Sequence, residues 1–197
     1  MQRGRLIVVS APSGSGKTTI AKKILEKFPF IKFSVSATTR PKRNGEVDGR
    51  DYFFLTREEF ERKIQNGELL EWEEIYGNYY GTLKSVVESA LKNGDILLFD
   101  VDVNGAISIK KKFPEDAVLI FIKPPNIETL KERLKKRRTE DEEQLKKRLE
   151  RVPMELEKAS YFDYIFVNDK LEDTVKAVLR AIFNEIEKWK AIQKHEY

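Results

Sequence analysis

The sequence of 197 residues contains no cysteine and only one histidine, His195. The lack of cysteine excludes disulfides, thiolate metal sites and a cysteine nucleophile, and one histidine argues against a histidine-based triad or a multi-histidine metal site. The longest strictly apolar run, residues 117–122, is far shorter than the roughly 20 residues of a membrane span. Behind the charged N-terminus only residues 6–9 are apolar, whereas a signal peptide needs about 7–15. We therefore expect a soluble, cytoplasmic protein without a membrane partner.

A large excess of charge of one sign is also missing. The chain has 37 Lys and Arg against 33 Asp and Glu, a net charge of +4, which argues against a general nucleic-acid-binding surface. Hydrophobic residues make up 40% of the chain, enough to build a core. The length corresponds to about one domain, with room for small inserted subdomains.

Short apolar runs alternate with helix-like stretches along most of the chain. Near-continuous apolar strands separated by helices predict an α/β fold, with a doubly wound parallel sheet covered on both faces. The expected strands are 6–9, 96–99, 117–122 and 164–167, and the expected helices are 17–28, 103–113, 126–138 and 171–193.

Two segments depart from this alternation. Residues 34–81 are rich in aromatic and charged side chains, and we interpret them as an inserted subdomain with a small mixed sheet. Within it, Thr56 and Glu59 form the sequence pattern of a capping box that opens a short helix. Residues 135–143 contain no apolar side chain, so we expect this segment between two helices to be exposed and mobile.

The strongest local signal is Ser-Ala-Pro-Ser-Gly-Ser-Gly-Lys-Thr at residues 10–18, between the first strand and the first helix. Glycines allow such a loop to turn its N–H groups towards a phosphate, and a helix N-terminus and a lysine add positive charge. The alternative is a Gly/Ser-rich turn with a chance lysine. The predicted phosphate-binding residues are Ala11, Pro12, Ser13, Gly14, Ser15, Gly16, Lys17, Thr18 and Thr19.

Two carboxylates follow the second predicted strand. Asp100 ends the run at 96–99, and Asp102 lies two residues further, on the same side of an extended chain. A carboxylate beside a phosphate loop is the expected partner of Mg²⁺, together with the hydroxyl of Thr18. The alternative is an ordinary residue of a turn at the end of a strand.

With these motifs in view, the chain strongly resembles guanylate kinase from residue 6 to about residue 169. The matching stretches are 10–18, 33–41, 45–52, 70–72, 77–81, 100–102 and 167–169. The resemblance implies a P-loop NTPase-type fold and transfer of the γ-phosphoryl group of ATP to GMP or dGMP in purine nucleotide metabolism, with Mg²⁺ as cofactor. It also implies a core of residues 1–33, 82–134 and 149–197, a GMP-binding subdomain at 34–81 and a lid at 135–148.

The resemblance assigns the GMP site residue by residue. Equivalents of Ser36, Glu71 and Asp102 face guanine, and a carboxylate there can accept from N1–H and the 2-amino group, two donors that adenine lacks. The alternative for the tyrosines is core packing of a small subdomain, and for the arginines a solvated surface. The implied GMP-binding residues are Ser36, Arg40, Arg43, Glu46, Tyr52, Glu71, Tyr80, Gly81, Thr82 and Asp102.

The ATP side is assigned in the same way. The resemblance places Arg137 and Arg148 on the ATP phosphates and implies a catalytic set of Lys17, Arg40, Arg137 and Arg148. Equivalents of Asn168 and Asp169 approach adenine. Arg133 is a weaker candidate, and Arg138 stands where the family usually has glycine. Without the resemblance, these arginines would be read as a solvated basic helix face.

Three other functions fit parts of the sequence less well. Guanylate-kinase-like scaffold modules bind peptides, but they typically lose residues of the phosphate loop or the GMP site. A kinase of the same fold could act on another nucleoside monophosphate or a sugar phosphate. A nucleic-acid-binding role for residues 131–138 conflicts with the acidic run at 140–143. The expected partners are ATP and GMP, with the oligomeric state open and a homo-oligomer included.

Overall fold

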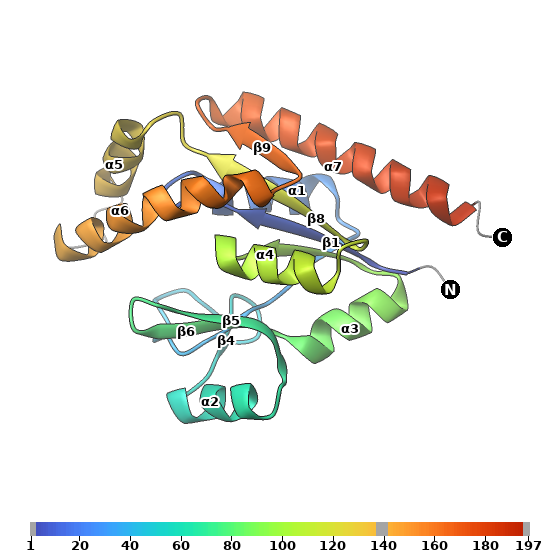
Figure 1. Ribbon diagram of the computed structural model, residues 1–197, viewed down its shortest axis with the longest axis horizontal. Helices are drawn as coiled ribbons and strands as arrows, with labels where there is room; N and C mark the ends of the chain where they lie inside the picture. Colours follow the sequence, from blue (N-terminus) through green and yellow to red (C-terminus); the bar gives the residue numbers. More distant parts are fainter. Residues whose placement is uncertain (1–2, 137–141, 195–197) are drawn as a thin grey trace.

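The computed structural model describes residues 3–136 and 142–194, and Figure 1 shows two sheets with helices packed around them. The strands are β1 (Arg5–Ser10), β2 (Ile31–Phe33), β3 (Ala37–Thr38), β4 (Phe53–Phe54), β5 (Leu69–Ile75), β6 (Asn78–Leu83), β7 (Ile96–Asp100), β8 (Ala117–Lys123) and β9 (Tyr164–Val167). The helices are α1 (Lys17–Lys27), α2 (Arg57–Gln65), α3 (Lys84–Asn93), α4 (Val103–Lys112), α5 (Ile127–Lys136), α6 (Glu142–Glu157), the 3₁₀ helix η1 (Lys158–Tyr161) and α7 (Leu171–Lys194).

The larger sheet has the strand order β2-β7-β1-β8-β9, and every neighbouring pair is parallel. The predicted α/β class and parallel sheet are therefore confirmed. The predicted strands are present as β1, β7, β8 and β9. Strand β2 was not predicted, because its three residues include only one buried apolar side chain, Ile31. The strands β1 and β7 lie side by side with Val9 opposite Asp100, so the ends of both strands meet at one edge of the sheet.

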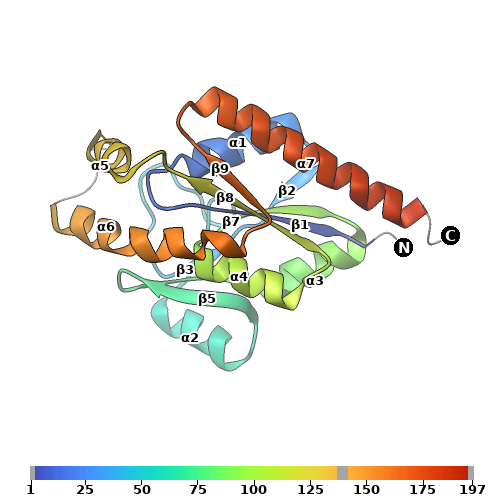
Figure 2. The same cartoon turned by 45° about the horizontal axis from the view of Figure 1, so that its top comes forward.

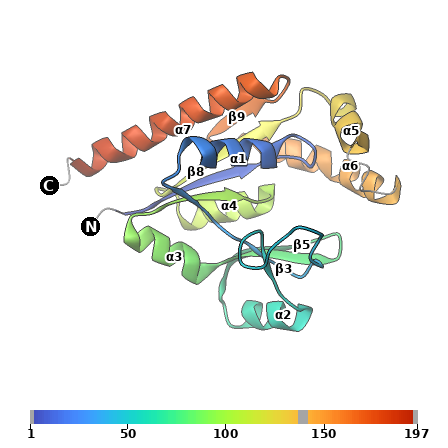
Figure 3. The same cartoon turned by 180° about the vertical axis from the view of Figure 1, so that it is seen from behind.

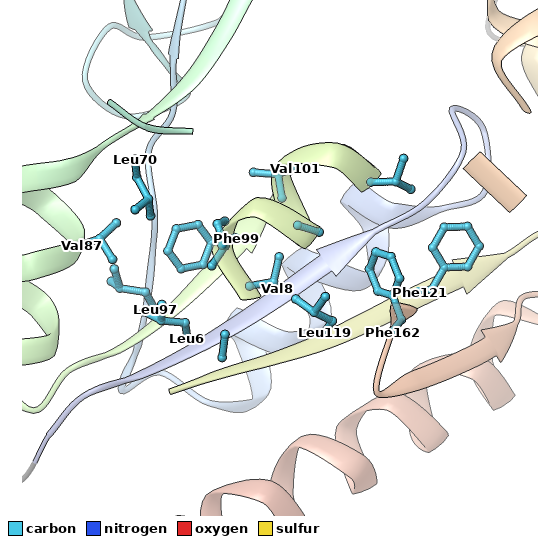
Figure 4. Packing of buried hydrophobic residues seen from close by; sticks show 14 of the residues in the cluster. Leu6, Val8, Leu70, Val87, Leu97, Phe99, Val101, Leu119, Phe121 and Phe162 are labelled. Atoms are coloured by element: carbon cyan, nitrogen blue, oxygen red, sulfur yellow. The ribbon is translucent and has the colours of Figure 1, made fainter. Parts of the chain in front are cut away.

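Helices cover both faces of this sheet because successive strand residues point to opposite sides. On β1, Ile7 and Val9 pack in a cluster with α1 and α7. Leu6 and Val8 pack instead with α3 and α4, and Figure 4 shows Phe99 of β7 in this second cluster. Figure 3 shows the same layers from behind, with α1 and α7 on one side of the sheet and α3 and α4 on the other.

The edge strand β9 departs from the expectation that both faces are covered. Its Tyr164 and Phe166 pack in the cluster that contains α7. The alternate residues Ile165 and Val167 are 48% and 54% exposed. A run of four apolar residues therefore does not show by itself that both faces of a strand are buried.

The smaller sheet has the order β4-β3-β6-β5 and confirms the predicted mixed sheet. β3 and β4 are parallel, whereas β6 is antiparallel to both β3 and β5. Its own core is centred on Phe60 of α2, which stacks on Tyr79 at 5.3 Å between ring centroids. Helix α2 begins at the predicted capping box of Thr56 and Glu59. Figure 2 shows this sheet and α2 below the larger sheet.

The helices α3 and α5 differ in whether the sequence predicted them. α3, which was not predicted, leads from β6 to the larger sheet and ends at Gly94, whose φ of 77° is favourable for glycine. The predicted helix at 126–138 is observed as α5, and its last predicted residues, with the rest of 137–141, lie outside the described residues. Among the helices within 3–136 and 142–194, none combines the length and the apolar composition of a membrane span.

Candidate active site

The loop between β1 and α1 has the geometry of an anion-binding loop. Gly14 and Gly16 have φ angles of 89° and 93°, a region that side chains disfavour, so glycine is required at both positions. Gly16 is also the N-cap of α1 and has no side chain that could accept from the first helical N–H groups. These groups, with the positive end of the helix dipole, are therefore available to a phosphate.

The loop rests on the turn after β9. The side-chain amide of Asn168 is 3% exposed and donates to the backbone oxygen of Ser15 at 2.7 Å. A Cβ atom on Gly16 would lie 2.5 Å from Asn168 Nδ2, so the two residues approach closely. Arg133 of α5 donates to the backbone oxygens of Asn168 and Asp169 at 3.0 and 3.2 Å. Asn168 thus supports the phosphate loop through its hydrogen bond to Ser15. The next residue, Asp169, is exposed.

Lys17, at the start of α1, is bound to the end of β7. Its Nζ lies 2.6 Å from Asp100 Oδ1 and donates to the Val101 backbone oxygen at 3.0 Å. Burial would lower the pKa of Lys17, but the Asp100 carboxylate outweighs it, and the pKa is raised. The ammonium is therefore charged at neutral pH, and the neighbouring Thr18 and Thr19 are exposed on the first turn of α1.

A cavity of about 170 Å³ lies between the phosphate loop and the smaller sheet. It brings together eight residues predicted for the site, and it adds Ile75 and Val101, which were not predicted. The lining residues are Lys17, Ser36, Tyr52, Glu71, Ile75, Tyr80, Gly81, Asp100, Val101 and Asp102.

One end of the cavity is acidic and largely buried. Thr82 donates its hydroxyl to Glu71 Oε1 at 2.5 Å, an arrangement fixed by the pairing of Glu71 with Thr82 across β5 and β6. Burial raises the pKa of Glu71 to about 7, the Thr82 hydrogen bond opposes this, and the charge of Asp102 adds to it. Asp102 is the N-cap of α4 and accepts from the Gly105 N–H at 2.7 Å.

Gly105 allows these two carboxylates to approach each other. A Cβ atom at this position would lie 2.8 Å from Glu71 Oε2 and 3.5 Å from Asp102 Oδ1. Glu71 thus lies against α4 at Gly105, where the helix has no side chain. Neutral N–H donors on a ligand would find both carboxylates at this end of the cavity.

A second group of predicted residues lies beside the aromatic wall of the cavity. Arg40 donates to both oxygens of Glu46 at 2.7 and 3.1 Å, and its guanidinium lies 5.4 Å from the ring centroid of Tyr52. Glu46 also accepts from the Arg43 backbone N–H at 2.7 Å. Tyr52 and Tyr80 meet edge to face at 6.2 Å. The structure therefore places Arg40, Arg43, Glu46 and both tyrosines in one neighbourhood, with the Arg43 side chain exposed.

Arg148 of α6 reaches the phosphate loop. Its Nη1 donates to the Ser13 hydroxyl at 2.5 Å, and its guanidinium lies 5.8 Å from the ring centroid of Tyr76. The predicted partner, Arg137, lies outside the described residues. Among the described residues, Arg148 is thus the predicted cation that α6 places at the loop.

Three residues near the acidic end were missed in the sequence. Glu73 lies two residues from Glu71, so both are on one face of β5, and this period-two spacing was the available signal. Arg151 lies three residues after Arg148, a helical spacing that puts both on one face of α6. Gly105 carried no signal in the sequence, because its importance depends on the approach of Glu71.

The chain is similar to known proteins along most of its length. The family model described as Guanylate kinase matches residues 3–185. The guanylate kinase of Chlorobium luteolum is 55% identical over 181 residues, which cover 92% of both chains. The guanylate kinase of Thermotoga maritima is 47% identical over 93% of this chain and 88% of that protein. The crystal structure of guanylate kinase from Anaplasma phagocytophilum matches with a TM-score of 0.77 and 35% identity, covering 93% of this chain and 87% of that chain.

Proposed function

This chain belongs to the guanylate kinase family, whose members phosphorylate GMP to GDP with ATP. On that basis we propose which of its residues bind each substrate and which stabilise the transferred phosphoryl group. The proposal depends most on one observation: Lys17, Glu71 and Asp102 line the same cavity. A phosphate-binding lysine and carboxylates suited to a base with N–H donors thus face the same space. This arrangement supports an ATP:GMP phosphotransferase.

Guanine binds at the acidic end in this proposal. Glu71 accepts from N1–H and the 2-amino group, Asp102 and Ser36 lie beside the base, and Thr82 holds Glu71 in place through its hydroxyl. Gly81 lines the cavity, and a Cβ atom there would lie 2.8 Å from the Glu71 backbone oxygen. Adenine has neither donor, so its binding would leave a buried carboxylate unpaired. A site of this kind discriminates between bases by roughly 10⁴–10⁵.

The phosphate of GMP binds beside the aromatic wall. Guanidinium groups bind phosphate oxygens through parallel N–H donors, and phenols add neutral donors. Arg40 and Arg43 supply the first, and Tyr52 and Tyr80 the second. Glu46 accepts hydrogen bonds from the guanidinium of Arg40 through both of its carboxylate oxygens. We assign Glu46 to orienting Arg40 before the phosphate arrives.

ATP phosphates bind in the loop formed by residues 11–19. The backbone N–H groups, Lys17 and Arg148 neutralise the charge that spreads over the transferred group. Arg137 is proposed for the same role from the resemblance alone. Asn168 and Asp169 belong to the ATP side, and the contact of Asn168 with Ser15 supports the loop directly.

The donor set fits Mg²⁺ bound mainly through substrate phosphates. Within 3–136 and 142–194, no group of three or more acidic or histidine side chains could hold a metal alone. Mg²⁺ commonly keeps several waters and takes only one or two protein ligands beside phosphates. Thr18 and Asp100 would hold the ion, which when bound draws charge from the β- and γ-phosphates.

The chain's residues then bind, orient and exclude water. No general base is needed, because the GMP phosphate is already ionised. The proposed GMP-binding subdomain, 34–81, and the proposed lid, 135–148, close over the core of residues 1–33, 82–134 and 149–197. Closure would limit the attack of water on ATP. We extend the proposal to dGMP as an acceptor and to a cytoplasmic location, with no nucleic-acid partner.

A coupled assay of ADP release tests this function. ATP and Mg²⁺ are combined with GMP, dGMP, AMP, CMP or UMP in turn. We expect turnover with the guanine nucleotides only. Turnover with another acceptor would contradict the assignment of Ser36, Glu71 and Asp102. Binding of GMP without turnover would favour the scaffold-type alternative.

A further inference from the structure

Arg151 of α6 lies among carboxylates that come from three elements. Its Nη2 is 2.9 Å from Glu73 of β5 and 3.7 Å from Asp102, the N-cap of α4. Its Nε is 3.5 Å from Glu155, one turn further along α6. The Arg151 side chain is only 19% exposed, so water screens these contacts weakly. One guanidinium thus joins β5, α4 and α6 beside the acidic end of the cavity.

Asp102 is held from two sides by this arrangement. Its Oδ1 accepts from the Gly105 N–H at 2.7 Å, and its Oδ2 is the atom that faces Arg151. The helix backbone and the guanidinium therefore fix both oxygens of a carboxylate that lines the cavity. Arg151 thus adds a second contact to the N-cap hydrogen bond that orients this side chain.

Glu73 connects the same guanidinium to the strand that carries Glu71. Glu73 Oε1 accepts from Arg151 and from the Asn104 side chain at 2.9 Å each, whereas Glu73 Oε2 is buried and makes no hydrogen bond. Lys158 of η1 donates to Asn104 in turn. Burial and the nearby Asp102 raise the pKa of Glu73 to about 7, and Arg151 opposes that rise.

The local charge balance depends on Arg151. Glu71, Glu73, Asp102 and Glu155 converge here, and burial raises the pKa of Glu155 to about 7 as well. Burial would lower the pKa of Arg151 itself, but Glu73, Asp102 and Glu155 outweigh it. Removing the cation from a buried group of this kind leaves unpaired charges, which is strongly unfavourable. The carboxylates would then repel one another and move apart.

We propose that Arg151 is a positioning residue for base recognition: it holds Asp102 and Glu73 in place, and so keeps the acidic end of the cavity shaped for guanine. This inference rests on the proposed binding of guanine at Glu71 and Asp102. The guanidinium of Arg151 contacts Glu73 and Asp102, whereas Arg148 contacts Ser13 of the phosphate loop. Its effect is therefore on the acceptor nucleotide.

The same helix reaches the other end of the site. Arg148, one turn before Arg151, contacts Ser13 of the phosphate loop and the ring of Tyr76 after β5. Figure 2 shows α6 passing alongside the tip of the β5–β6 hairpin. The two arginines thus divide their contacts: Arg148 serves the phosphate loop, and Arg151 serves the acidic end.

Steady-state kinetics of Arg151→Met and Arg151→Lys test the proposal. In Arg151→Met we expect the KM for GMP to rise about tenfold, the order lost with one buried charge-assisted contact. The KM for ATP should stay within about twofold, and kcat within about threefold. Arg151→Lys keeps the charge but not the planar fork, so it should lie between Arg151→Met and the wild type. Arg180→Met, at an exposed arginine of α7, is the matched control and should change none of these values.

A double variant tests whether the unpaired negative charge causes the rise in the KM for GMP. Glu73→Gln in the Arg151→Met background should lower the KM for GMP again by at least about threefold, since the carboxylate that lost its cation becomes neutral. A purely structural role predicts a lower Tm, equal rises in both KM values and no rescue, and that result would overturn the proposal. An unchanged KM for GMP in Arg151→Met would also overturn it, while leaving the proposed function intact if the wild type phosphorylates GMP. A wild type inactive with GMP would overturn both.

Discussion

The phosphate loop and the acidic end of the cavity recognise charge in opposite ways. The loop presents backbone N–H groups at the start of α1, and its one charged side chain, Lys17, is held by Asp100 at 2.6 Å. The acidic end uses side chains of β5, β6 and α4, and the pKa of Glu71 there is raised to about 7. The first region is thus fixed in charge at neutral pH, whereas the second is poised between two protonation states.

Because the two regions are built differently, different kinds of substitution should impair each of them. A loop made of backbone groups is sensitive to residues that change its path, such as Gly16 and the supporting Asn168. A pocket made of converging carboxylates is sensitive to whatever sets their spacing and charge. Variants of the first kind should affect ATP, and variants of the second kind should affect the acceptor nucleotide.

The largest effect is expected at Lys17. Lys17→Ala removes the positive charge that we propose neutralises the transferred phosphate, and it should lower kcat by about 10²–10³, or roughly 2.7–4 kcal/mol. Steady-state ADP release measures it. Lys22→Ala, on the exposed side of α1, is the control and should retain the wild-type rate. A loss of less than tenfold in Lys17→Ala would contradict the role of the loop.

The next effect is expected at Glu71. Glu71→Gln exchanges a carboxylate for an amide whose NH₂ group faces the guanine donors, and kcat/KM for GMP should fall about 10²-fold, as expected for two lost charge-assisted hydrogen bonds. The KM for ATP should not change. Glu74→Gln, on the opposite face of β5, is the matched control. Equal losses of kcat/KM for GMP and for ATP would show that the acidic end and the phosphate loop do not act separately.

A smaller effect is expected at Asn168, whose side chain supports the phosphate loop. Asn168→Ala deletes the hydrogen bond to the Ser15 backbone oxygen, and the KM for ATP should rise about tenfold as the loop loses its fixed path. The KM for GMP serves as the internal reference and should stay within about twofold. A rise confined to GMP would reverse the comparison between the regions.

The smallest effect is expected at Gly105. A Cβ atom there would lie 2.8 Å from Glu71 Oε2, so Gly105→Ala should displace that flexible side chain and raise the KM for GMP about threefold to fivefold. Alanine is favoured over glycine within a helix by up to about 1 kcal/mol. The Tm should therefore not fall while GMP binding weakens. A lower Tm with an unchanged KM would mean that the helix, not Glu71, moves.

The sequence predicted the loop more completely than the acidic end, for a physical reason. A phosphate loop is contiguous, so residues 10–18 and the strand and helix around them carry the whole pattern. The four strands 6–9, 96–99, 117–122 and 164–167 were predicted because buried parallel strands are continuously apolar. Strand β2 escaped because its three residues include only one buried apolar side chain. The exposed face of β9 escaped because its four apolar residues do not reveal that the strand lies at the edge of the sheet.

The acidic end could be predicted only in part. Ser36, Glu71, Tyr80 and Asp102 were assigned through a resemblance, and the structure brings them to one cavity. Arg151, Glu73 and Gly105 carry no motif, because their importance arises from contacts between elements distant in sequence. The approach of α6 to β5 is a tertiary property, and neither helix nor strand periodicity encodes it.

In the proposed function, guanine is recognised by a carboxylate whose pKa lies near neutral pH. Because burial raises the pKa of Glu71 to about 7, part of the free protein carries a proton there at neutral pH. Guanine donors favour the ionised form, so binding should lower this pKa and release that proton. The affinity for GMP should accordingly weaken as pH falls below about 7, approaching tenfold per unit.

The most direct test is calorimetry of GMP binding at about pH 7 in buffers of different ionisation enthalpy, which counts the protons released. The difference between the wild type and Glu71→Gln isolates Glu71 from Glu73, Glu155 and the GMP phosphate. We predict that the wild type releases about half a proton more than Glu71→Gln, as for a group at its pKa. Equal proton release in the two proteins, with GMP bound in both, would contradict the reading of guanine by the Glu71 carboxylate.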